Sequence, residues 1–244
     1  MIVFKRNIFG HVLFIKKWLI RIIGFISYKR FQGINQLNIT GINIIKDLPE
    51  NNVLFISNHQ TYFADATAMF HVFNASINSY NDIRNKKYIW NPKLNIYFIA
   101  AKETMKSGIL PRILAYAGSV PIERTWKNKD TKIKRNVQYK DVNNINKAIK
   151  DGWLITFPQG TTEPWAPIRK GTAHIIKENK PIVIPIVIDG FRESFDKTGL
   201  RIRKKGVMQS MIIKKPLEID YTNDTLDDIV DKVSFAIEQH SSLK

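Results

Sequence analysis

Residues 53–65 read VLFISNHQTYFAD, and this stretch decides the fold. Its opening VLFIS is apolar up to Ser57 without polar alternation, which is typical of a strand buried on both faces of a sheet. The run IVIPIVI at residues 182–188 has the same character. Strands of this kind occur in sheets that helices cover on both sides. The stretch therefore predicts an α/β fold with polar residues directly after a central strand.

From residue 37 onward, apolar strands alternate with amphipathic helices. We expect strands at Leu37–Ile45, Val53–Ser57, Asn95–Ala100, Ser119–Ile122, Trp153–Phe157, Ile182–Ile188 and Ser210–Ile213. We expect helices at Ala66–Phe73, Pro111–Ala117, Val142–Lys150, Thr172–Glu178 and Thr225–Gln239. This order predicts an α/β domain over residues 35–244, with a mixed sheet of about seven strands flanked by helices. An N-terminal interfacial helical element over residues 1–34 precedes it.

Composition limits the classes of function. The chain has 244 residues, a formal net charge of +17 and no cysteine. Disulfides, thiolate nucleophiles and cysteine-ligated metals are therefore excluded, and a reducing compartment is compatible. A balance this basic implies an anionic partner, which is nucleic acid, a membrane face or an acidic carrier protein. No acidic residue occurs before Asp47, so the N-terminal stretch is purely basic.

Residues 8–27 read IFGHVLFIKKWLIRIIGFIS, and we expect them to form an amphipathic helix in the membrane interface. On a helix, the cations fall in one sector of roughly 160°, where they would face lipid phosphates; they are Lys5, Arg6, Lys16, Lys17 and Arg21. Cations in mid-span disfavour a transmembrane helix, and the following Tyr28-Lys29-Arg30 does not fit signal-peptide cleavage. The alternative is a core helix whose lysine stems reach out to solvent.

These features favour membrane lipids over nucleic acid as the partner. The basic residues concentrate on an apolar helix, and no recognised nucleic-acid-binding motif occurs. We therefore expect a peripheral or monotopic protein on the cytoplasmic face of the cell membrane. The sequence leaves the oligomeric state open.

His59 and Asp65 are candidate catalytic residues. His59 follows the buried strand, and ligand-binding groups in α/β proteins gather at the carboxyl ends of strands. A carboxylate that accepts one ring N–H of a histidine leaves the other nitrogen as a base. Taken alone, however, His59 fits a hydrogen-bonded loop histidine better, and Asp65 fits a helix N-cap better.

Two further segments carry candidate binding residues. The expected strand Trp153–Phe157 runs into Pro158-Gln159-Gly160-Thr161-Thr162, a turn whose exposed N–H groups suit an oxyanion or a phosphate. Arg124 follows a short apolar strand, where a guanidinium can grip a phosphate or a carboxylate. The alternatives are an ordinary loop and a surface ion pair with Glu123 or Asp130.

In this order, the segments resemble the four blocks of the glycerolipid acyltransferase family, which includes the 1-acylglycerol-3-phosphate acyltransferases. The first block is Asn58-His59 with Asp65, and the second is Gly118 to Arg124. The third is Phe157-Pro158-Gln159-Gly160-Thr161, and Arg169-Lys170-Gly171 resembles the basic-Gly pair that follows it. The fourth is Ile184-Pro185-Ile186. The resemblance spans about residues 35 to 190.

The resemblance implies that the histidine deprotonates an acceptor hydroxyl, which attacks an acyl thioester directly. Acyl-CoA or acyl carrier protein would serve as co-substrate, with no metal and no other cofactor. His59 and Asp65 would be catalytic, and the substrate-binding residues would be Arg124, Gln159, Gly160, Thr161, Thr162 and Lys170. It also implies an N-terminal helical membrane element.

Three departures from the family pattern concern the site. Five residues separate His59 from Asp65 where the family has four, so the turn must absorb one residue. Gln159 replaces a glutamate, and Thr162 replaces an arginine that helps to hold the acceptor phosphate. A lysophosphatidate acceptor is the family default, and a lyso-amino-acid lipid of the ornithine or glycine type is the alternative. A catalytically inactive lipid-binding relative is a more distant one.

Overall fold

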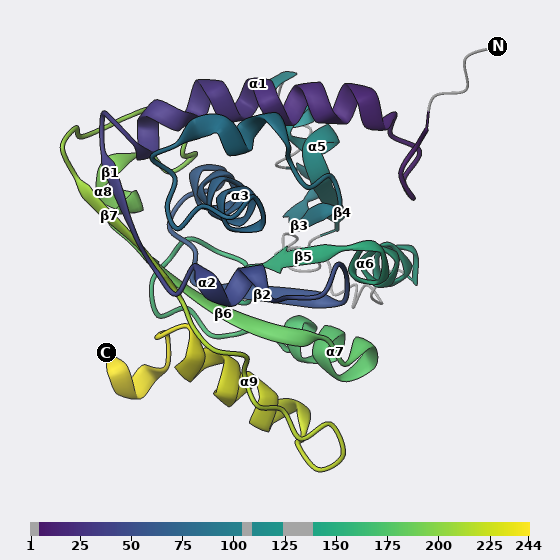
Figure 1. Ribbon diagram of the computed structural model, residues 1–244. Helices are drawn as coiled ribbons and strands as arrows, with labels where there is room; N and C mark the ends of the chain where they lie inside the picture. Colours follow the sequence, from purple (N-terminus) through teal and green to yellow (C-terminus); the bar gives the residue numbers. More distant parts are fainter. Residues whose placement is uncertain (1–4, 104–108, 124–138) are drawn as a thin grey trace.

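In the computed structural model, which describes residues 5–103, 109–123 and 139–244, one sheet has the strand order β1-β7-β6-β2-β5-β3-β4 (Figure 1). The strands are β1 (Gln36–Thr40), β2 (Val53–Ser57), β3 (Ile96–Ala101), β4 (Ser119–Ile122), β5 (Trp153–Thr156), β6 (Ile182–Asp189) and β7 (Met208–Ile213). Strands β6, β2, β5, β3 and β4 are mutually parallel. Strand β7 is antiparallel to β6 and parallel to β1, so the mixed seven-stranded sheet is confirmed.

Helices cover both faces of this sheet, because alternate residues of the central strands are apolar in both directions. Phe55 packs into one core with α3, whereas Leu54 and Ile56 pack into a second core with α7 and α9. Helices α1, α3 and α5 lie on the first side and α6, α7 and α9 on the second (Figure 1). The helices are α1 (Leu13–Phe31), α2 (Asn43–Lys46), α3 (Ala64–Ile77), α5 (Ile109–Gly118), α6 (Tyr139–Asp151), α7 (Lys170–Asn179), α8 (Phe191–Ser194) and α9 (Leu226–Ala236), with 3-10 turns η1 (Lys86–Trp90) and η2 (Ser241–Leu243).

The first expected strand, Leu37–Ile45, is wrong in its second half. Strand β1 ends at Thr40, and Gly41 follows with φ +79°, a conformation that L side chains rarely adopt. A Cβ on Gly41 would lie 2.1 Å from the carbonyl oxygen of Ile213, so the chain must turn there. The apolar residues that resembled a strand belong to helix α2 and its start, where Ile42 and Ile45 are buried.

The N-terminal helix exists, but it begins at Leu13 rather than at Ile8. Before it, the chain turns at Gly10 with φ +83°, and Arg6 and Val12 form an isolated antiparallel bridge. Helix α1 packs over α3 and η1, so one of its faces belongs to the first core (Figure 1).

Lys16 corrects the expected charge pattern of α1. Its side chain is fully buried rather than turned toward lipid, and its Nζ lies 4.7 Å from the centre of the Tyr97 ring. That nitrogen has no hydrogen-bond partner among the described residues. Burial lowers the pKa of Lys16 to about 8, against the attraction of Asp151.

The outer face of α1 is apolar. Its exposed large side chains recur at helical spacing and are Phe14, Ile15, Trp18, Ile22, Phe25 and Ile26. We call this set the α1 stripe. Trp90 of η1 is exposed beside it and packs edge-on against Phe25 at 5.1 Å between ring centroids. No helix within the described ranges is long and apolar enough to cross a membrane.

Candidate active site

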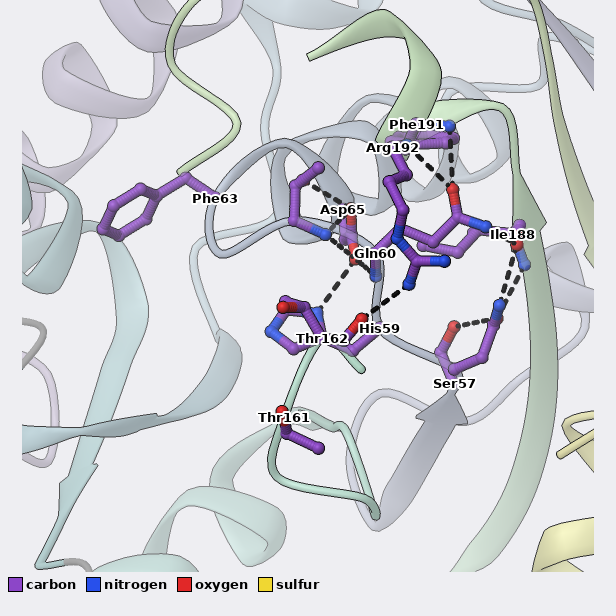
Figure 2. Close-up of polar contacts among 12 residues, drawn as sticks. Ser57, His59, Gln60, Phe63, Asp65, Thr161, Thr162, Ile188, Phe191 and Arg192 are labelled. Carbon is purple, nitrogen blue, oxygen red and sulfur yellow. Dashed lines mark hydrogen bonds and ion pairs between the residues drawn. The ribbon is translucent and has the colours of Figure 1, made fainter. Parts of the chain in front are cut away.

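His59 and Asp65 meet at the carboxyl end of the central strand β2. The Nδ1 atom of His59 lies 2.9 Å from Oδ2 of Asp65, which is fully buried in the first turn of α3 (Figure 2). The His59 side chain is 11% exposed, and its ring stacks on Phe157 at 3.9 Å between ring centroids. The carboxylate thus orients the imidazole with Nδ1 inward, so Nε2 is the nitrogen placed to act as a base.

The Asp65 carboxylate also organises the loop that precedes it. Its oxygens accept hydrogen bonds from the backbone N–H of Gln60 at 2.6 Å, the backbone N–H of Thr61 and the Thr61 hydroxyl at 2.6 Å. Asp65 therefore holds both the imidazole ring of His59 and the shape of the loop.

A distant segment absorbs the additional residue between His59 and Asp65. The backbone N–H groups of Tyr62 and Phe63 donate to the carbonyls of Lys197 and Thr198 at 3.1 and 3.0 Å. Gly199 packs so tightly against this loop that a Cβ there would lie 2.5 Å from the backbone nitrogen of Ala64. The longer loop is therefore pinned from outside, and Asp65 reaches the ring despite the spacing.

Two amide side chains beside His59 attach this segment to strand β6 and to helix α8. Asn58 Nδ2 donates to the Ile188 carbonyl, and Asn58 Oδ1 accepts from the Ile188 N–H, both at 2.8 Å. Gln60 Oε1 accepts the backbone N–H groups of Phe191 and Arg192 at 2.9 and 3.0 Å. Sequence reasoning missed the anchoring role of Asn58 and Gln60. The available signal was that amides flank the histidine directly after a buried strand.

The Gly160 turn lies beside the pair through the stacking of Phe157 on His59. Gly160 has φ +64°, and Thr161 Oγ1 accepts the backbone N–H of Glu163 at 3.3 Å. Thr162 is buried, and its carbonyl accepts a hydrogen bond from Arg192 Nη2 at 2.6 Å (Figure 2). Backbone geometry thus places this turn next to the histidine.

Gln159 and Lys170, two other expected binding residues, contact the C-terminal part of the chain. Gln159 is buried, and its Nε2 donates to the Ala166 carbonyl at 3.0 Å and to Gln239 Oε1 at 3.1 Å. Lys170 Nζ forms an ion pair with Asp227 of α9 at 2.7 Å. These contacts hold α9 and its C-terminal end against the domain. A substrate role for either residue stays a prediction.

Arg124 lies outside the described residues, so its position is not part of the site described here. The residue before it, Glu123, pairs with Lys102 at 3.1 Å, and Lys102 also pairs with Asp141 at 3.2 Å. These ion pairs link the segments that follow β3 and β4 to each other and to α6. No cluster of His, Asp and Glu that could hold a metal ion occurs among the residues whose placement is described.

A family model described as Acyltransferase matches residues 36–189, which contain both His59 and the Gly160 turn. The chain belongs to the acyltransferase family. The fold of this acyltransferase is also that of a solved structure, the 1-acyl-sn-glycerophosphate acyltransferase PlsC from Thermotoga maritima. The TM-score is 0.57 at 16% identity, over 92% of this chain and 78% of that one. No curated protein matches the chain.

The acyltransferase also has an apolar cavity against helix α3. It lies between α1, α3, η1 and β3 and opens to solvent, and the space inside it and at its opening together amounts to about 610 Å³. Phe63, two residues before Asp65, forms part of its wall, together with Ile20, Gly24, Ala66 and Phe98. The cavity therefore lies under helix α1, and neither His59 nor Asp65 contributes to its wall.

The polar groups in the wall of this cavity are satisfied internally. His71 Nε2 lies 2.8 Å from Ser27 Oγ, and His71 Nδ1 lies 2.8 Å from the Tyr88 hydroxyl. Complete burial lowers the pKa of His71 to about 4, so the ring is neutral at physiological pH. Because Ser27 also donates to the Ile23 carbonyl at 2.7 Å, His71 donates to Ser27 from Nε2 and accepts from Tyr88. The cavity thus presents an apolar lining to a ligand.

Proposed function

We propose that this acyltransferase transfers a fatty acyl group from acyl-CoA or acyl carrier protein to the hydroxyl of a lysolipid, with 1-acylglycerol-3-phosphate as acceptor. The reaction would belong to phospholipid biosynthesis. The observation that carries the proposal is the His59–Asp65 pair, held at 2.9 Å, and Phe63 of the loop between them lies in the wall of an apolar cavity. Such a pair supplies a base for a hydroxyl, and such a cavity suits an acyl chain.

In the proposed reaction, Nε2 of His59 takes the proton of the acceptor hydroxyl as the oxygen attacks the thioester carbonyl. The resulting tetrahedral intermediate expels the thiolate. The imidazolium gives the thiolate the proton that it took from the acceptor, and the thiol leaves. Asp65 stabilises the imidazolium while it exists. The acyl group passes directly between substrates, which agrees with a chain that has no cysteine.

The N–H of Gly160 itself donates to the Phe157 carbonyl at 2.9 Å. The other N–H groups of this turn would bind the oxyanion of that intermediate or the acceptor head group. The hydrocarbon chain of the donor would enter the cavity along Phe63 and Ala66. Burial in such a site contributes about 0.8 kcal/mol for each methylene removed from water. The cavity would therefore select for acyl chain length.

We further propose that the enzyme works as a peripheral protein on the cytoplasmic face of the membrane. The α1 stripe would enter the interface, with Trp18 and Trp90 at the level of the lipid head groups. Helix α1 also forms one wall of the cavity through Ile20, Ile23 and Gly24. A lipid substrate could then pass from the membrane into the site with little contact with water. The net charge of +17 would attract anionic lipids and an anionic donor.

A lyso-amino-acid lipid is the second candidate acceptor. The observation that favours it is Thr162, which stands where the family pattern has a phosphate-binding arginine. A free carboxylate needs less positive charge than a phosphate dianion. Offering both acceptors together in one assay distinguishes the candidates, because the preferred one is consumed first.

The test of the proposed function is a pair of histidine variants. His59→Ala should lower turnover with lysophosphatidate by roughly 100- to 10,000-fold, since that is the usual contribution of a positioned base. His174→Ala, which removes an exposed histidine from α7, should keep wild-type activity. Retention of more than a tenth of turnover by folded His59→Ala would contradict the proposed mechanism.

A further inference from the structure

Arg192 joins the histidine loop to the Gly160 turn. Its backbone N–H donates to Gln60 Oε1 at 3.0 Å, and Gln60 is the residue after His59. Its guanidinium donates from Nη2 to the Thr162 carbonyl at 2.6 Å. In Figure 2 the side chain extends from α8 toward Thr162, on the side where the ring of His59 lies. A cation from a distant segment thus sits at the residue where the family pattern has its arginine.

The backbone around Arg192 is rigidly defined. Gly190, with φ +79°, turns the chain as it leaves β6, and a Cβ there would lie 2.8 Å from the Met208 carbonyl oxygen. Ser194 Oγ donates to the Gly190 carbonyl at 2.7 Å, which closes the short helix α8. Because Gln60 accepts its N–H, the backbone of Arg192 is held in place. Little backbone freedom is therefore lost when its side chain binds a ligand.

Neighbouring carboxylates are engaged with other partners. Glu193 pairs with Lys204 at 2.5 Å, and Glu163 pairs with Lys197 at 3.3 Å. Asp189 accepts a hydrogen bond from Gln60 Nε2 at 3.0 Å. A guanidinium has five N–H donors, and Nη2 carries its bond to Thr162. The side chain is exposed, so donors remain for an anion arriving from solvent.

We propose that Arg192 binds the anionic head group of the acceptor and replaces, from the β6–β7 connection, the cation that Thr162 does not provide. This inference rests on the proposed function and identifies a specificity-determining residue for it. The guanidinium fork matches two oxygens of a phosphate, which a threonine hydroxyl at residue 162 cannot do. Arg192 therefore makes a phosphorylated acceptor compatible with this altered third block.

The decisive variant is Arg192→Gln. Its amide can still donate to the Thr162 carbonyl, so the link to the turn is retained while the charge is lost. Because a hydrogen bond to a charged group is worth about 1.5–3 kcal/mol, the KM for lysophosphatidate should rise roughly 10- to 150-fold. The KM for monoacylglycerol, which has no phosphate, and the KM for the donor should stay unchanged. Arg203→Ala, an exposed cation on the same connection, is the matched control.

Two additional measurements complete the test. Thr162→Arg in the Arg192→Gln background should restore most of the lost affinity, because it returns a cation to the residue where the family has one. Titration of lysophosphatidate into His59→Ala, with and without Arg192→Gln, should show the same 10- to 150-fold loss in binding without any turnover. Arg192→Gln should leave the melting temperature within a few degrees of the parent.

The inference would be overturned if Arg192→Gln raised the KM for lysophosphatidate and for monoacylglycerol equally, or raised the KM for lysophosphatidate no more than Arg203→Ala does. Arg192 would then be only a structural link. If the wild-type protein acylates no lysolipid, the proposed function fails, and the binding titration still decides the role of Arg192. If the wild type turns over lysophosphatidate and Arg192→Gln does so with unchanged KM, the inference alone fails.

Discussion

Replacement of Asp65 by asparagine separates the catalytic role of the carboxylate from its role in the loop. Oδ2 accepts from His59 Nδ1, from the Gln60 N–H and from the Thr61 N–H, whereas Oδ1 accepts chiefly from the Thr61 hydroxyl. An asparagine with its oxygen at the Oδ2 position keeps the first three bonds. Its NH₂ group can then donate to the Thr61 hydroxyl, which rotates to accept. We therefore expect Asp65→Asn to fold with the ring in place.

The catalytic cost of this variant follows from the lost charge alone. A hydrogen bond to a charged group is worth about 1.5–3 kcal/mol and one between neutral groups about 0.5–1.5 kcal/mol. The difference of about 1–2 kcal/mol corresponds to a roughly 5- to 30-fold fall in kcat. His59→Ala removes the base itself and should cost roughly 100- to 10,000-fold. We therefore expect Asp65→Asn to lose less kcat than His59→Ala, because the asparagine keeps the hydrogen bond to the ring and loses only the charge.

Asp65→Ala should behave differently, because it leaves the N–H groups of Gln60 and Thr61 without an acceptor. Each unsatisfied buried donor costs about 1–3 kcal/mol, a large part of a typical domain stability of about 5–15 kcal/mol. Thermal unfolding, together with kcat at saturating donor and acceptor, distinguishes the three variants. The reasoning is refuted if folded Asp65→Asn is as inactive as His59→Ala, or if it retains full activity.

Three further predictions concern α1 and the cavity. Ile22→Gln combined with Ile26→Gln should reduce flotation of the protein with anionic vesicles at least tenfold, since burial of each such side chain is worth about 1.5–3 kcal/mol. The control Met208→Gln, at an exposed apolar residue on β7, should leave flotation unchanged. Complete extraction of the intact protein by high salt alone would contradict the interfacial role of the α1 stripe. Lys16→Met should stabilise the fold at neutral pH by up to about 3 kcal/mol, because the lowering of the Lys16 pKa from 10.5 to about 8 is a cost of that size. Between pH 8 and pH 10.5, the unfolded chain keeps the proton on Lys16 and the folded chain loses it. Wild-type stability should therefore rise with pH through that window, and the advantage of Lys16→Met should shrink. An advantage that does not change with pH would disprove this reading of Lys16. Ala66→Phe should narrow the cavity and shift the donor preference to shorter acyl chains. In kcat/KM measured over a series of donors, each excluded methylene should cost about 0.8 kcal/mol. A uniform loss of kcat/KM for all chain lengths would place the acyl chain elsewhere.

Much of the central architecture follows from the sequence. The unbroken apolar run at Val53–Ser57 indicated a strand buried on both faces, and its register beside β5 and β6 agrees with that. The polar residues after it were expected at the carboxyl end of the sheet, where His59 lies. These features are local, because a strand and the loop that follows it are written in consecutive residues. The strand expected over Leu37–Ile45 is wrong after Thr40, because apolar periodicity does not show that the backbone of Gly41 must pass close to the carbonyl of Ile213.

Only the tertiary structure decided the contacts between residues far apart in the chain. Sequence spacing left open how Asp65 could reach His59, and the carbonyls of Lys197 and Thr198 pin the longer loop that allows it. The charge pattern of α1 placed Lys16 toward lipid, whereas packing buries it against Tyr97. Arg192 had no motif to identify it, because its proximity to Thr162 depends on how β6 lies beside β2. Sequence patterns report which faces are apolar and which residue types recur, but the partner of each side chain is set by long-range packing.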